Sequence, residues 1–332
     1  MNTILVTGGA GYIGSHVVQQ LTGRGERVVV IDNLSSGFVE AVRDAELVIG
    51  DVGDPELVGK VLAGYAVDAV MHFAAHTIVS ESVSNPLKYY ANNTGNTRNL
   101  LASCVEAGVA QIIFSSTAAV YGMTPAGVAD EGTPTQPVNP YGHSKLMSET
   151  MVRDISATGA MRHVILRYFN VAGCDPQGHI GQNTPNATLL IKAVCEHAVG
   201  KRESISVFGT DYDTPDGTGI RDYIHVEDLA AAHLSALDHL RSSGESLTLN
   251  CGYGHGYSVR EVIDAVRRAS GSSMNIIELP RRSGDLPMLI ACADRLRQQF
   301  GWNPKYDDLD VIVGTALAWE RKLAASHGAA AN

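Results

Sequence analysis

The first half of the chain alternates between short apolar runs and amphipathic stretches of helical period. The first apolar run ends at Thr7, directly before Gly8 and Gly9. Others cover residues 27–32, 47–52, 69–75, 111–117 and 164–169. Continuous apolar runs of this length, bounded by turn residues, are typical of strands buried on both faces of a parallel sheet. With helices between them, the pattern predicts an α/β fold, a doubly wound parallel sheet of the Rossmann type.

Residues that favour helix starts agree with this reading. Asp54 followed by Pro55 begins one helix, and Asn139 followed by Pro140 begins another, with Asn139 as the N-cap. Residues 86–108 form a further long helical stretch. Each of these helices follows or precedes a predicted strand, as a doubly wound sheet requires.

The regular alternation of predicted strands and helices ends after residue 170. Residues 174–185 are rich in Gly, Pro, Asn and Asp and are predicted to form a loop. Helical stretches over 187–199 and 259–270 and a short strand over 206–209 then follow irregularly. We therefore predict a dinucleotide-binding domain over 1–170, to which about 222–240 return, and a smaller mixed α/β substrate domain over 171–332.

Composition narrows the class of protein. The chain has 332 residues, 45% of them hydrophobic and 18% charged, as is usual for soluble globular proteins. A net charge of −10 argues against a nucleic-acid or anionic-membrane partner. The five cysteines form no CxxC pair, and neither a signal sequence nor an apolar run near ~20 residues is present. We expect a cytoplasmic protein without a membrane segment or a metal site.

The turn after the first strand carries the strongest local signal. It reads Gly9-x-Gly11-x-x-Gly14, preceded by Gly8, between a strand and a helix that begins at Tyr12. A pyrophosphate reaches the amides of a helix N-terminus only where no Cβ stands in its way. A glycine-rich turn without a ligand is the alternative, but the strand-turn-helix setting favours dinucleotide binding.

The next strand indicates which dinucleotide is bound. It ends in Asp32, eighteen residues after Gly14, where a carboxylate can receive the ribose hydroxyls of the adenosine. No Lys or Arg occurs in the ten residues that follow, so a 2′-phosphate would have no partner there. NAD is therefore favoured over NADP. Asp51, at the end of the third strand, either reaches the adenine or caps a loop.

Candidate chemistry gathers at the same edge of the sheet. The fifth strand ends in Thr117, and Tyr141 and Lys145 lie four residues apart near the start of a helix, on one face. A free tyrosine has a pKa of about 10, but a nearby ammonium and an oxidised nicotinamide ring favour the phenolate. Tyr141 can then remove the proton of an alcohol while Thr117 holds the same oxygen.

The chain resembles the UDP-glucose 4-epimerases of the extended short-chain dehydrogenase/reductase superfamily. The resemblance extends from Thr7 to Trp302 and rests on these segments: TGGAGYIGSH (7–16), HFAA (72–75), SSTAAVYG (115–122), PYGHSK (140–145), LRYFN (166–170), FGTDYDTPDGTGIRDYIHVEDLA (208–230) and RRSGDLP (281–287). It implies interconversion of UDP-glucose and UDP-galactose through a 4-keto sugar with bound NAD. It also implies a homodimer paired through the helices at 86–108 and 139–159.

The resemblance assigns roles to individual residues. Tyr141 is implied as the base, Lys145 as its activator and Thr117 as the Ser or Thr of the site. NAD contacts are implied for Gly8, Gly11, Tyr12, Ile13, Gly14, Asp32, Asn33, Asp51, Val52, Phe73, Ala74, Asn92, Tyr141, Lys145 and Tyr168. Contacts to the UDP-sugar are implied for Thr117, Asn170, Phe208, Arg221, Arg282 and Asp285. Two arginines also suit a diphosphate on an acidic protein, because each guanidinium can donate two parallel hydrogen bonds to phosphate oxygens.

Three positions depart from the family's usual residues: Thr77, Thr188 and Leu289. They leave open a 4-epimerase that acts on UDP-N-acetylglucosamine and UDP-N-acetylgalactosamine, or on UDP-xylose and UDP-arabinose. A 4,6-dehydratase is disfavoured because Ala118 and Ala119, not acidic residues, follow Thr117. A non-catalytic dinucleotide sensor is disfavoured because Tyr141 and Lys145 are both present.

Overall fold

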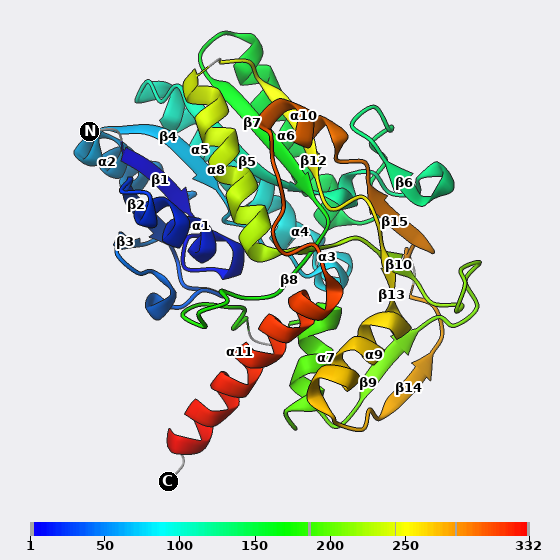
Figure 1. Ribbon diagram of the computed structural model, residues 1–332. Coiled ribbons are helices and arrows are strands. Elements are labelled where there is room, and N and C mark those ends of the chain that lie inside the picture. Colours follow the sequence, from blue (N-terminus) through cyan, green and yellow to red (C-terminus); the bar gives the residue numbers. More distant parts are fainter. Residues whose placement is uncertain (1–2, 185–186, 243, 283, 331–332) are drawn as a thin grey trace.

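A seven-stranded parallel sheet forms the centre of the computed structural model, which describes residues 3–184, 187–242, 244–282 and 284–330 (Figure 1). The strand order is β12-β7-β5-β4-β1-β2-β3, and every pairing is parallel. The strands are β1 (Thr3–Thr7), β2 (Arg27–Asp32), β3 (Glu46–Ile49), β4 (Val67–His72), β5 (Gln111–Thr117), β7 (Arg162–Tyr168) and β12 (Leu247–Cys251). The predicted doubly wound fold is confirmed.

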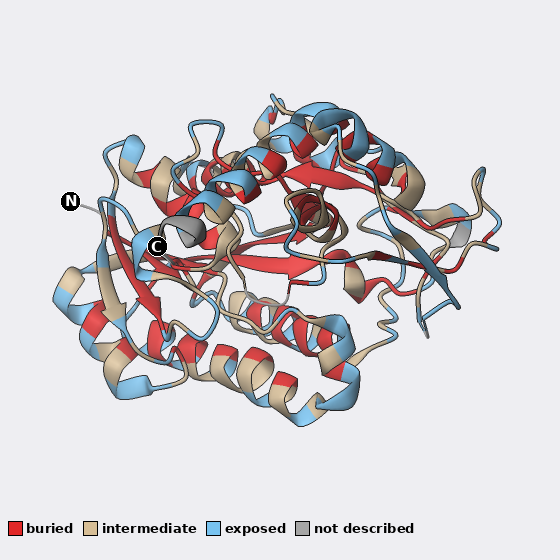
Figure 2. Ribbon diagram, turned by 90° about the horizontal axis from the view of Figure 1, so that it is seen from below, coloured by how far each residue is buried: buried red, intermediate tan, exposed pale blue. Residues whose placement is uncertain are grey.

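Helices cover both faces of this sheet because its strands are apolar on both sides. Ile4 and Val6 of β1 pack in the core beneath α1 (Tyr12–Gly23) and α8 (Val226–Ser242). Leu5, between them, points to the opposite core beneath α2 (Pro55–Tyr65), α5 (Asn96–Glu106) and α6 (Pro140–Ala157). Alternation of side chains along a strand produces this division. Figure 2 shows the buried strands enclosed between the two helical layers.

The helix starts lie where the sequence predicts them. Asp54 accepts hydrogen bonds from the amides of Glu56 and Leu57, and Asn139 accepts one from Gly142. The stretch 86–108 is helical but not uniform: α4 (Pro86–Tyr89) is followed by a π-helical turn η2 (Tyr90–Gly95) and then by α5. Short segments complete this half: η1 (Val39–Ala41), α3 (Val79–Ser84), η3 (Ala118–Val120), η4 (Pro125–Gly127) and β6 (Val128–Ala129).

The second half, together with β6 of the first, forms three small sheets, and it carries the remaining helices. One sheet has the order β13-β10-β15-β6, and two strand pairs are β11-β8 and β14-β9. The elements are β8 (Asn170–Ala172), α7 (Leu190–Ala198), β9 (Ile205–Phe208), β10 (Ile220–Arg221), β11 (Tyr223–His225), β13 (Tyr257–Ser258), α9 (Val259–Ser270), β14 (Ile276–Leu279), β15 (Met288–Ala291), α10 (Asp294–Phe300) and α11 (Leu309–Ala330).

One strand lies outside the predicted arrangement. Residues 247–251 belong to the predicted second domain and were not expected to form a strand, but as β12 they pair with β7 at the edge of the large sheet. Helix α8 packs against α1, β5 and β7 of the first half. The division of the chain into two domains stays a prediction.

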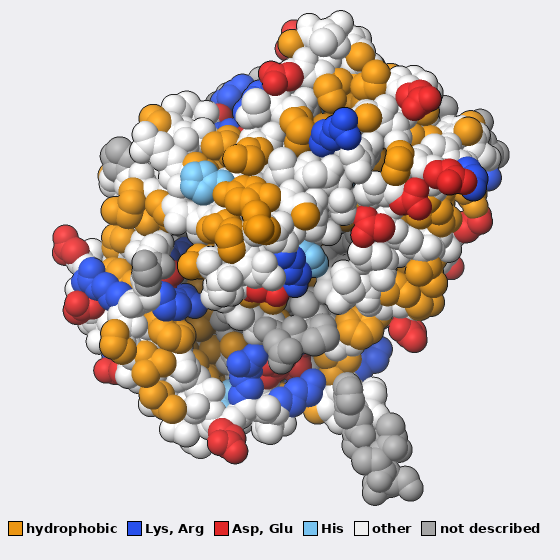
Figure 3. All heavy atoms as spheres, turned by 180° about the vertical axis from the view of Figure 1, so that it is seen from behind, with side chains coloured by type: hydrophobic (Ala, Val, Ile, Leu, Met, Phe, Trp, Pro, Cys, Tyr) orange, Lys and Arg blue, Asp and Glu red, His pale blue; other side chains and the backbone are white. Residues whose placement is uncertain are grey.

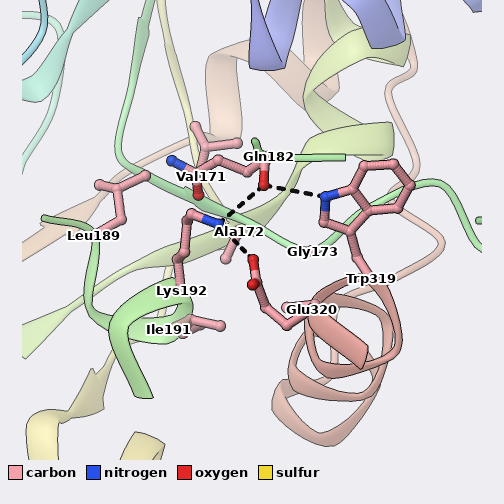
Figure 4. A pocket seen from close by; sticks show the side chains of 10 residues that line it. Val171, Ala172, Gly173, Gln182, Leu189, Ile191, Lys192, Trp319 and Glu320 are labelled. Atoms are coloured by element: carbon pink, nitrogen blue, oxygen red, sulfur yellow. Dashed lines mark hydrogen bonds and ion pairs between the residues drawn. The ribbon is translucent and has the colours of Figure 1, made fainter. Parts of the chain in front are cut away.

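A small cavity between β8, α7 and α11 belongs to the scaffold (Figure 4). Lys192 and the Trp319 indole both point at the carbonyl oxygen of Gln182, each at 3.1 Å, and Lys192 also pairs with Glu320. Both members of this ion pair are buried. Because its polar groups bind one another, we interpret this cluster as the contact that joins α11 to α7.

Candidate active site

The glycine turn after β1 packs against the end of β4. Gly8 has φ of +72°, and a Cβ added there would lie 2.6 Å from the backbone nitrogen of Ala74. A Cβ on Gly14 would lie 2.3 Å from the carbonyl oxygen of Gly8. Gly11 differs, because an added Cβ would meet only that same oxygen, at 3.2 Å. Packing therefore explains Gly8 and Gly14, whereas Gly11 leaves room for a ligand beside the turn.

The helix that follows offers its N-terminus to an anion. α1 begins at Tyr12, its N-cap Gly11 has no side chain to bond the first amides, and no acidic residue lies in the first turn. Such a terminus carries a partial positive charge and unsatisfied N–H groups. β1 lies between β2 and β4, where the strand order reverses, which is the place where doubly wound sheets bind their ligands. These residues fit the diphosphate of a dinucleotide.

Acidic and amide side chains gather one strand further along the sheet. Asp32 is buried and accepts hydrogen bonds from the amides of Ala10 (2.9 Å) and Leu34 (2.8 Å). Asp51 accepts bonds from the amide groups of Asn33 (3.2 Å) and Asn96 (2.8 Å). Asp32 forms no ion pair among the described residues. The geometry suits two ribose hydroxyls and offers no cation for a 2′-phosphate.

Asp32→Asn should weaken NAD binding about 10-fold, because it removes the carboxylate while keeping the side-chain shape. Measurable NADP binding should appear at the same time, since the charge that repels a 2′-phosphate is gone. Isothermal titration of the nucleotide-free protein measures both. Asp238→Asn, at a surface ion pair with Arg24, is the control. Unchanged NAD affinity in Asp32→Asn would remove Asp32 from the cofactor site.

The predicted catalytic residues meet where β5 ends. Tyr141 and Lys145 are both buried on α6, and the Thr117 side chain lies close enough to Tyr141 to lower the pKa of its hydroxyl. The Lys145 ammonium lies over the ring of Phe114, 4.4 Å from its centroid. His72 of β4 packs on the Phe114 ring, with centroids 5.7 Å apart, and is held between the hydroxyls of Thr7 (2.6 Å) and Thr97 (2.9 Å).

Burial dominates the electrostatics of this group. It raises the pKa of Tyr141, and the Thr117 side chain acts in the opposite direction. Burial also lowers the pKa of Lys145 to about 7, with Glu149 opposing the shift. The His72 pKa falls to about 3, first through burial and then through the Lys145 charge, so this imidazole is neutral near pH 7. A lysine that titrates near neutrality beside a buried tyrosine is typical of proton-transfer sites.

The other predicted cofactor residues line the same edge of the sheet. The Tyr12 hydroxyl donates to the carbonyl oxygen of Gly173 at 2.6 Å, which fixes α1 to the start of the second half. Phe73 and Tyr168 pack their rings on His233. Asn92 lies on the π-helical turn and donates to the side chain of Asn93. The structure places the remaining members beside these, at the starts of helices or the ends of strands: Ile13, Val52 and Ala74.

The predicted substrate residues form a second group in the small sheets. Arg282 stacks on the ring of Phe208, 4.5 Å from its centroid, and pairs with Asp285 at 2.8 Å. Arg221 of β10 donates to the carbonyl oxygen of Ile220, and no carboxylate lies within ion-pair distance of it in the described part of the chain. Burial lowers its pKa, with Asp285 among the groups opposing that shift. Arg221 is thus a largely enclosed cation without an anionic partner.

Two buried carboxylates, Asp222 and Glu149, support these groups, and neither is among the predicted site residues. Asp222 accepts hydrogen bonds from the backbone amides of Tyr253, Gly254 and Ala291, which fixes the strand that carries Arg221. Glu149 of α6 accepts hydrogen bonds from the side chains of Ser116, Arg153 and Arg167. A signal for Glu149 exists, because it lies four residues after Lys145 and continues the buried face of that helix. Asp222 has no comparable signal, since its partners lie about 30 to 70 residues away.

Several known proteins match this chain closely. A UDP-glucose 4-epimerase of Azospirillum brasilense is 56% identical over 328 residues, which cover 98% of this chain and 94% of that protein. The crystal structure of UDP-glucose 4-epimerase from Brucella ovis in complex with NAD is 43% identical, with a TM-score of 0.93 over 96% of this chain and 98% of that one. The Bifidobacterium longum enzyme in complex with NAD+ and UDP is 39% identical, with a TM-score of 0.92 over 97% and 98%.

The family model agrees with these relatives. That of the NAD dependent epimerase/dehydratase family matches residues 4–252, which include the glycine turn, Thr117, Tyr141, Lys145 and Arg221. The sheet order and the helix positions described above are those of a doubly wound dinucleotide-binding fold. The chain therefore belongs to the NAD-dependent epimerase/dehydratase family and, within it, to the UDP-glucose 4-epimerases.

Proposed function

We propose that this protein interconverts UDP-glucose and UDP-galactose at C4, with NAD held in the site. The observation that carries the proposal is the convergence of Thr117, Tyr141 and Lys145 beside a glycine turn, in a chain whose second half presents the unpaired Arg221. The relatives solved with NAD, or with NAD+ and UDP, support the same pair of ligands.

The chemistry of the reaction assigns a task to each side chain. NAD, when bound, would supply the hydride acceptor for C4 and, once reduced, the hydride donor for the other face of the sugar. The Tyr141 oxygen takes the proton of the C4 hydroxyl, and the Thr117 hydroxyl holds that oxygen in line. The Lys145 ammonium stabilises the tyrosine phenolate, which burial alone would disfavour.

Epimerisation also sets requirements for binding. The 4-keto sugar must turn over within the site, so the protein has to hold the UDP part firmly and the sugar loosely. Arg221 and Arg282, on different segments of the second half, can bind the two phosphates, since guanidinium groups form paired hydrogen bonds with phosphate oxygens. Phe208 and Asn170 lie on the strands β9 and β8 of the same half.

The sugar pocket is apolar on one side. Leu289 lies beside Arg221 in the register of β15 with β10 and packs with Ala118, Phe169 and Leu286. The size of the Leu289 side chain does not decide which sugar fits, so a 4-epimerase of N-acetylated or pentose UDP-sugars is the alternative function. Incubation with UDP-glucose, UDP-N-acetylglucosamine and UDP-xylose in parallel tests this. Turnover of UDP-glucose at the highest kcat/KM supports the proposal, and faster turnover of another sugar contradicts it.

A cytoplasmic location is part of the proposal. All five cysteines are free thiols, four of them buried, as is usual in a reducing compartment. Among the described residues, no helix has the length and apolar character that crossing a membrane would need.

We further propose a homodimer formed through α4, α5 and α6. The face of the molecule that these helices help to cover carries a patch of hydrophobic side chains (Figure 3). Leu87 of α4 is 77% exposed, and Met147 of α6 and Val105 of α5 are also exposed. Large apolar side chains on such a surface are typical of a contact between subunits.

Leu87→Glu should convert the dimer to a monomer at micromolar concentration, because it places a charge in the proposed contact. Light scattering measures the mass. The matched control is Ile49→Glu, at an apolar residue on β3 that is 63% exposed, which should leave the mass unchanged. A parent protein that is monomeric at this concentration would contradict the proposal.

A further inference from the structure

One buried carboxylate lies directly behind the proposed catalytic pair. The Glu149 side chain is 0% exposed and receives four hydrogen bonds. Ser116 (2.5 Å) and the Arg167 Nε (2.9 Å) donate to one oxygen, and the Arg167 Nη2 (2.6 Å) and Arg153 (2.9 Å) donate to the other. These partners hold the pKa of Glu149 below its ordinary value although burial acts to raise it. Glu149 is therefore an ionised group in the core.

The partners of Glu149 are chain neighbours of the proposed site residues. Ser116 precedes Thr117 on β5, and Arg167 precedes Tyr168 on β7. The register pairs Ser116 with Arg167 and Thr117 with Tyr168. Ser116 and Arg167 turn toward α6 and bond Glu149 one residue before each strand reaches its last residue, Thr117 and Tyr168. A single carboxylate thus joins α6 to the ends of both strands.

The network continues from Arg167 toward the second half. Arg167 stacks on the ring of Tyr121 at 5.0 Å, and its Nη1 donates to the Tyr121 hydroxyl at 3.1 Å. That hydroxyl donates to the side chain of Asn250 on β12, which in turn donates to the carbonyl oxygen of Ala129 on β6. β6 pairs with β15, the strand of Leu289. The same chain of contacts therefore reaches from the catalytic helix to the proposed sugar pocket.

We propose that Glu149 is a positioning residue for the reaction: its carboxylate, held by Ser116 and Arg167, keeps Tyr141 and Lys145 in place against Thr117 and Tyr168 and keeps a negative charge beside Lys145. This inference rests on the proposed epimerase function and adds a residue that does not touch the substrate or NAD.

The electrostatic part of the role has a defined sign. Lys145 faces the neutral His72 from β4, the Phe114 ring from β5 and Glu149 from its own helix. Burial lowers the Lys145 pKa, and Glu149 is the group that opposes this. Without the Glu149 charge, the ammonium would be lost at a lower pH.

Glu149→Gln, measured in the NAD-loaded enzyme, should lower kcat about 10- to 100-fold through misplacement of the catalytic pair. The KM for UDP-glucose and the NAD content should stay unchanged, because the residues proposed to bind both ligands are retained. The alkaline limb of the kcat–pH profile should move to lower pH by about one unit, as the Lys145 ammonium loses its neighbouring charge.

Three further variants separate the two parts of the role. Glu149→Asp keeps the charge but shortens the side chain, so kcat should fall without a shift of the pH profile. Ser116→Ala should behave likewise, with a smaller loss of about 3- to 10-fold for one hydrogen bond. Thr150→Ala removes a hydroxyl from the exposed side of the same helix, where it bonds the Leu146 carbonyl and Arg153, and it should leave both quantities unchanged.

The proposal is overturned if Glu149→Gln keeps the parent's kcat and pH profile, or if it changes only in step with lost NAD content. Should Glu149→Gln not fold, Ser116→Ala decides: a lower kcat at full NAD content supports the proposal, and an unchanged kcat contradicts it. Absence of epimerisation in the parent protein would instead refute the proposed function itself.

Discussion

Tyr141→Phe should lower kcat for UDP-glucose by about three orders of magnitude, within the range that general acid–base groups supply. The phenylalanine keeps the packing of the buried ring but has no oxygen to take the C4 proton. NAD content and the affinity for UDP should stay at the parent's values, because the glycine turn and the arginines are untouched. Steady-state kinetics and nucleotide analysis of the same preparation measure all three.

The control is Tyr89→Phe. Tyr89 is also buried and packs edge-on against Tyr141 with ring centroids 6.4 Å apart, but its hydroxyl donates to Ile78 and Glu81. Removing that hydroxyl should change kcat by no more than a few-fold. If Tyr141→Phe retained turnover close to that of Tyr89→Phe, Tyr141 would not be the base.

Arg221→Met should weaken binding of UDP about 100-fold. The guanidinium has no carboxylate partner in the described part of the chain, so the variant removes a charge-assisted contact to the diphosphate without breaking an ion pair. The methionine keeps most of the apolar length of the side chain within β10. Isothermal titration with UDP measures the change.

NAD content should be unaffected by Arg221→Met, since Arg221 lies in the second half of the chain. The matched control is Arg268→Met, which removes an exposed arginine paired with Asp310 and should leave UDP affinity unchanged. Equal UDP affinity in both variants would exclude Arg221 from the phosphate site.

The fold could be predicted from the sequence because the relevant signals are local. Apolar runs mark the strands, and the caps Asp54 and Asn139 mark helix starts that the structure reproduces. The edge strand β12 was not predicted because Leu247–Cys251 is short and its apolar residues alternate with polar ones. Only the tertiary structure shows that it pairs with β7. The π-helical turn η2 was not predicted either, because residues 86–108 follow a helical pattern throughout and nothing in that pattern marks the turn.

The residues of the candidate site likewise include some that the sequence predicts and others that only the structure reveals. Gly8, Gly14, Tyr141 and Lys145 are recognisable because their spacing along the chain carries the chemistry. The supporting carboxylates Glu149 and Asp222 are different, because an isolated acidic residue is most often exposed and only its tertiary partners show that it is buried. Each is recognised only by its hydrogen-bond partner, which is Arg167 for Glu149 and the backbone of β15 for Asp222. These partners are far away in sequence.

The central claim, that hydrogen leaves C4 and returns to it within one active site, can be tested with a single label. UDP-glucose carrying deuterium at C4 is incubated with the purified protein without added NAD, and the products are separated and analysed by mass spectrometry and NMR. We predict UDP-galactose that retains the deuterium at C4. Loss of the label to solvent, or no UDP-galactose from NAD-loaded protein, would contradict the account.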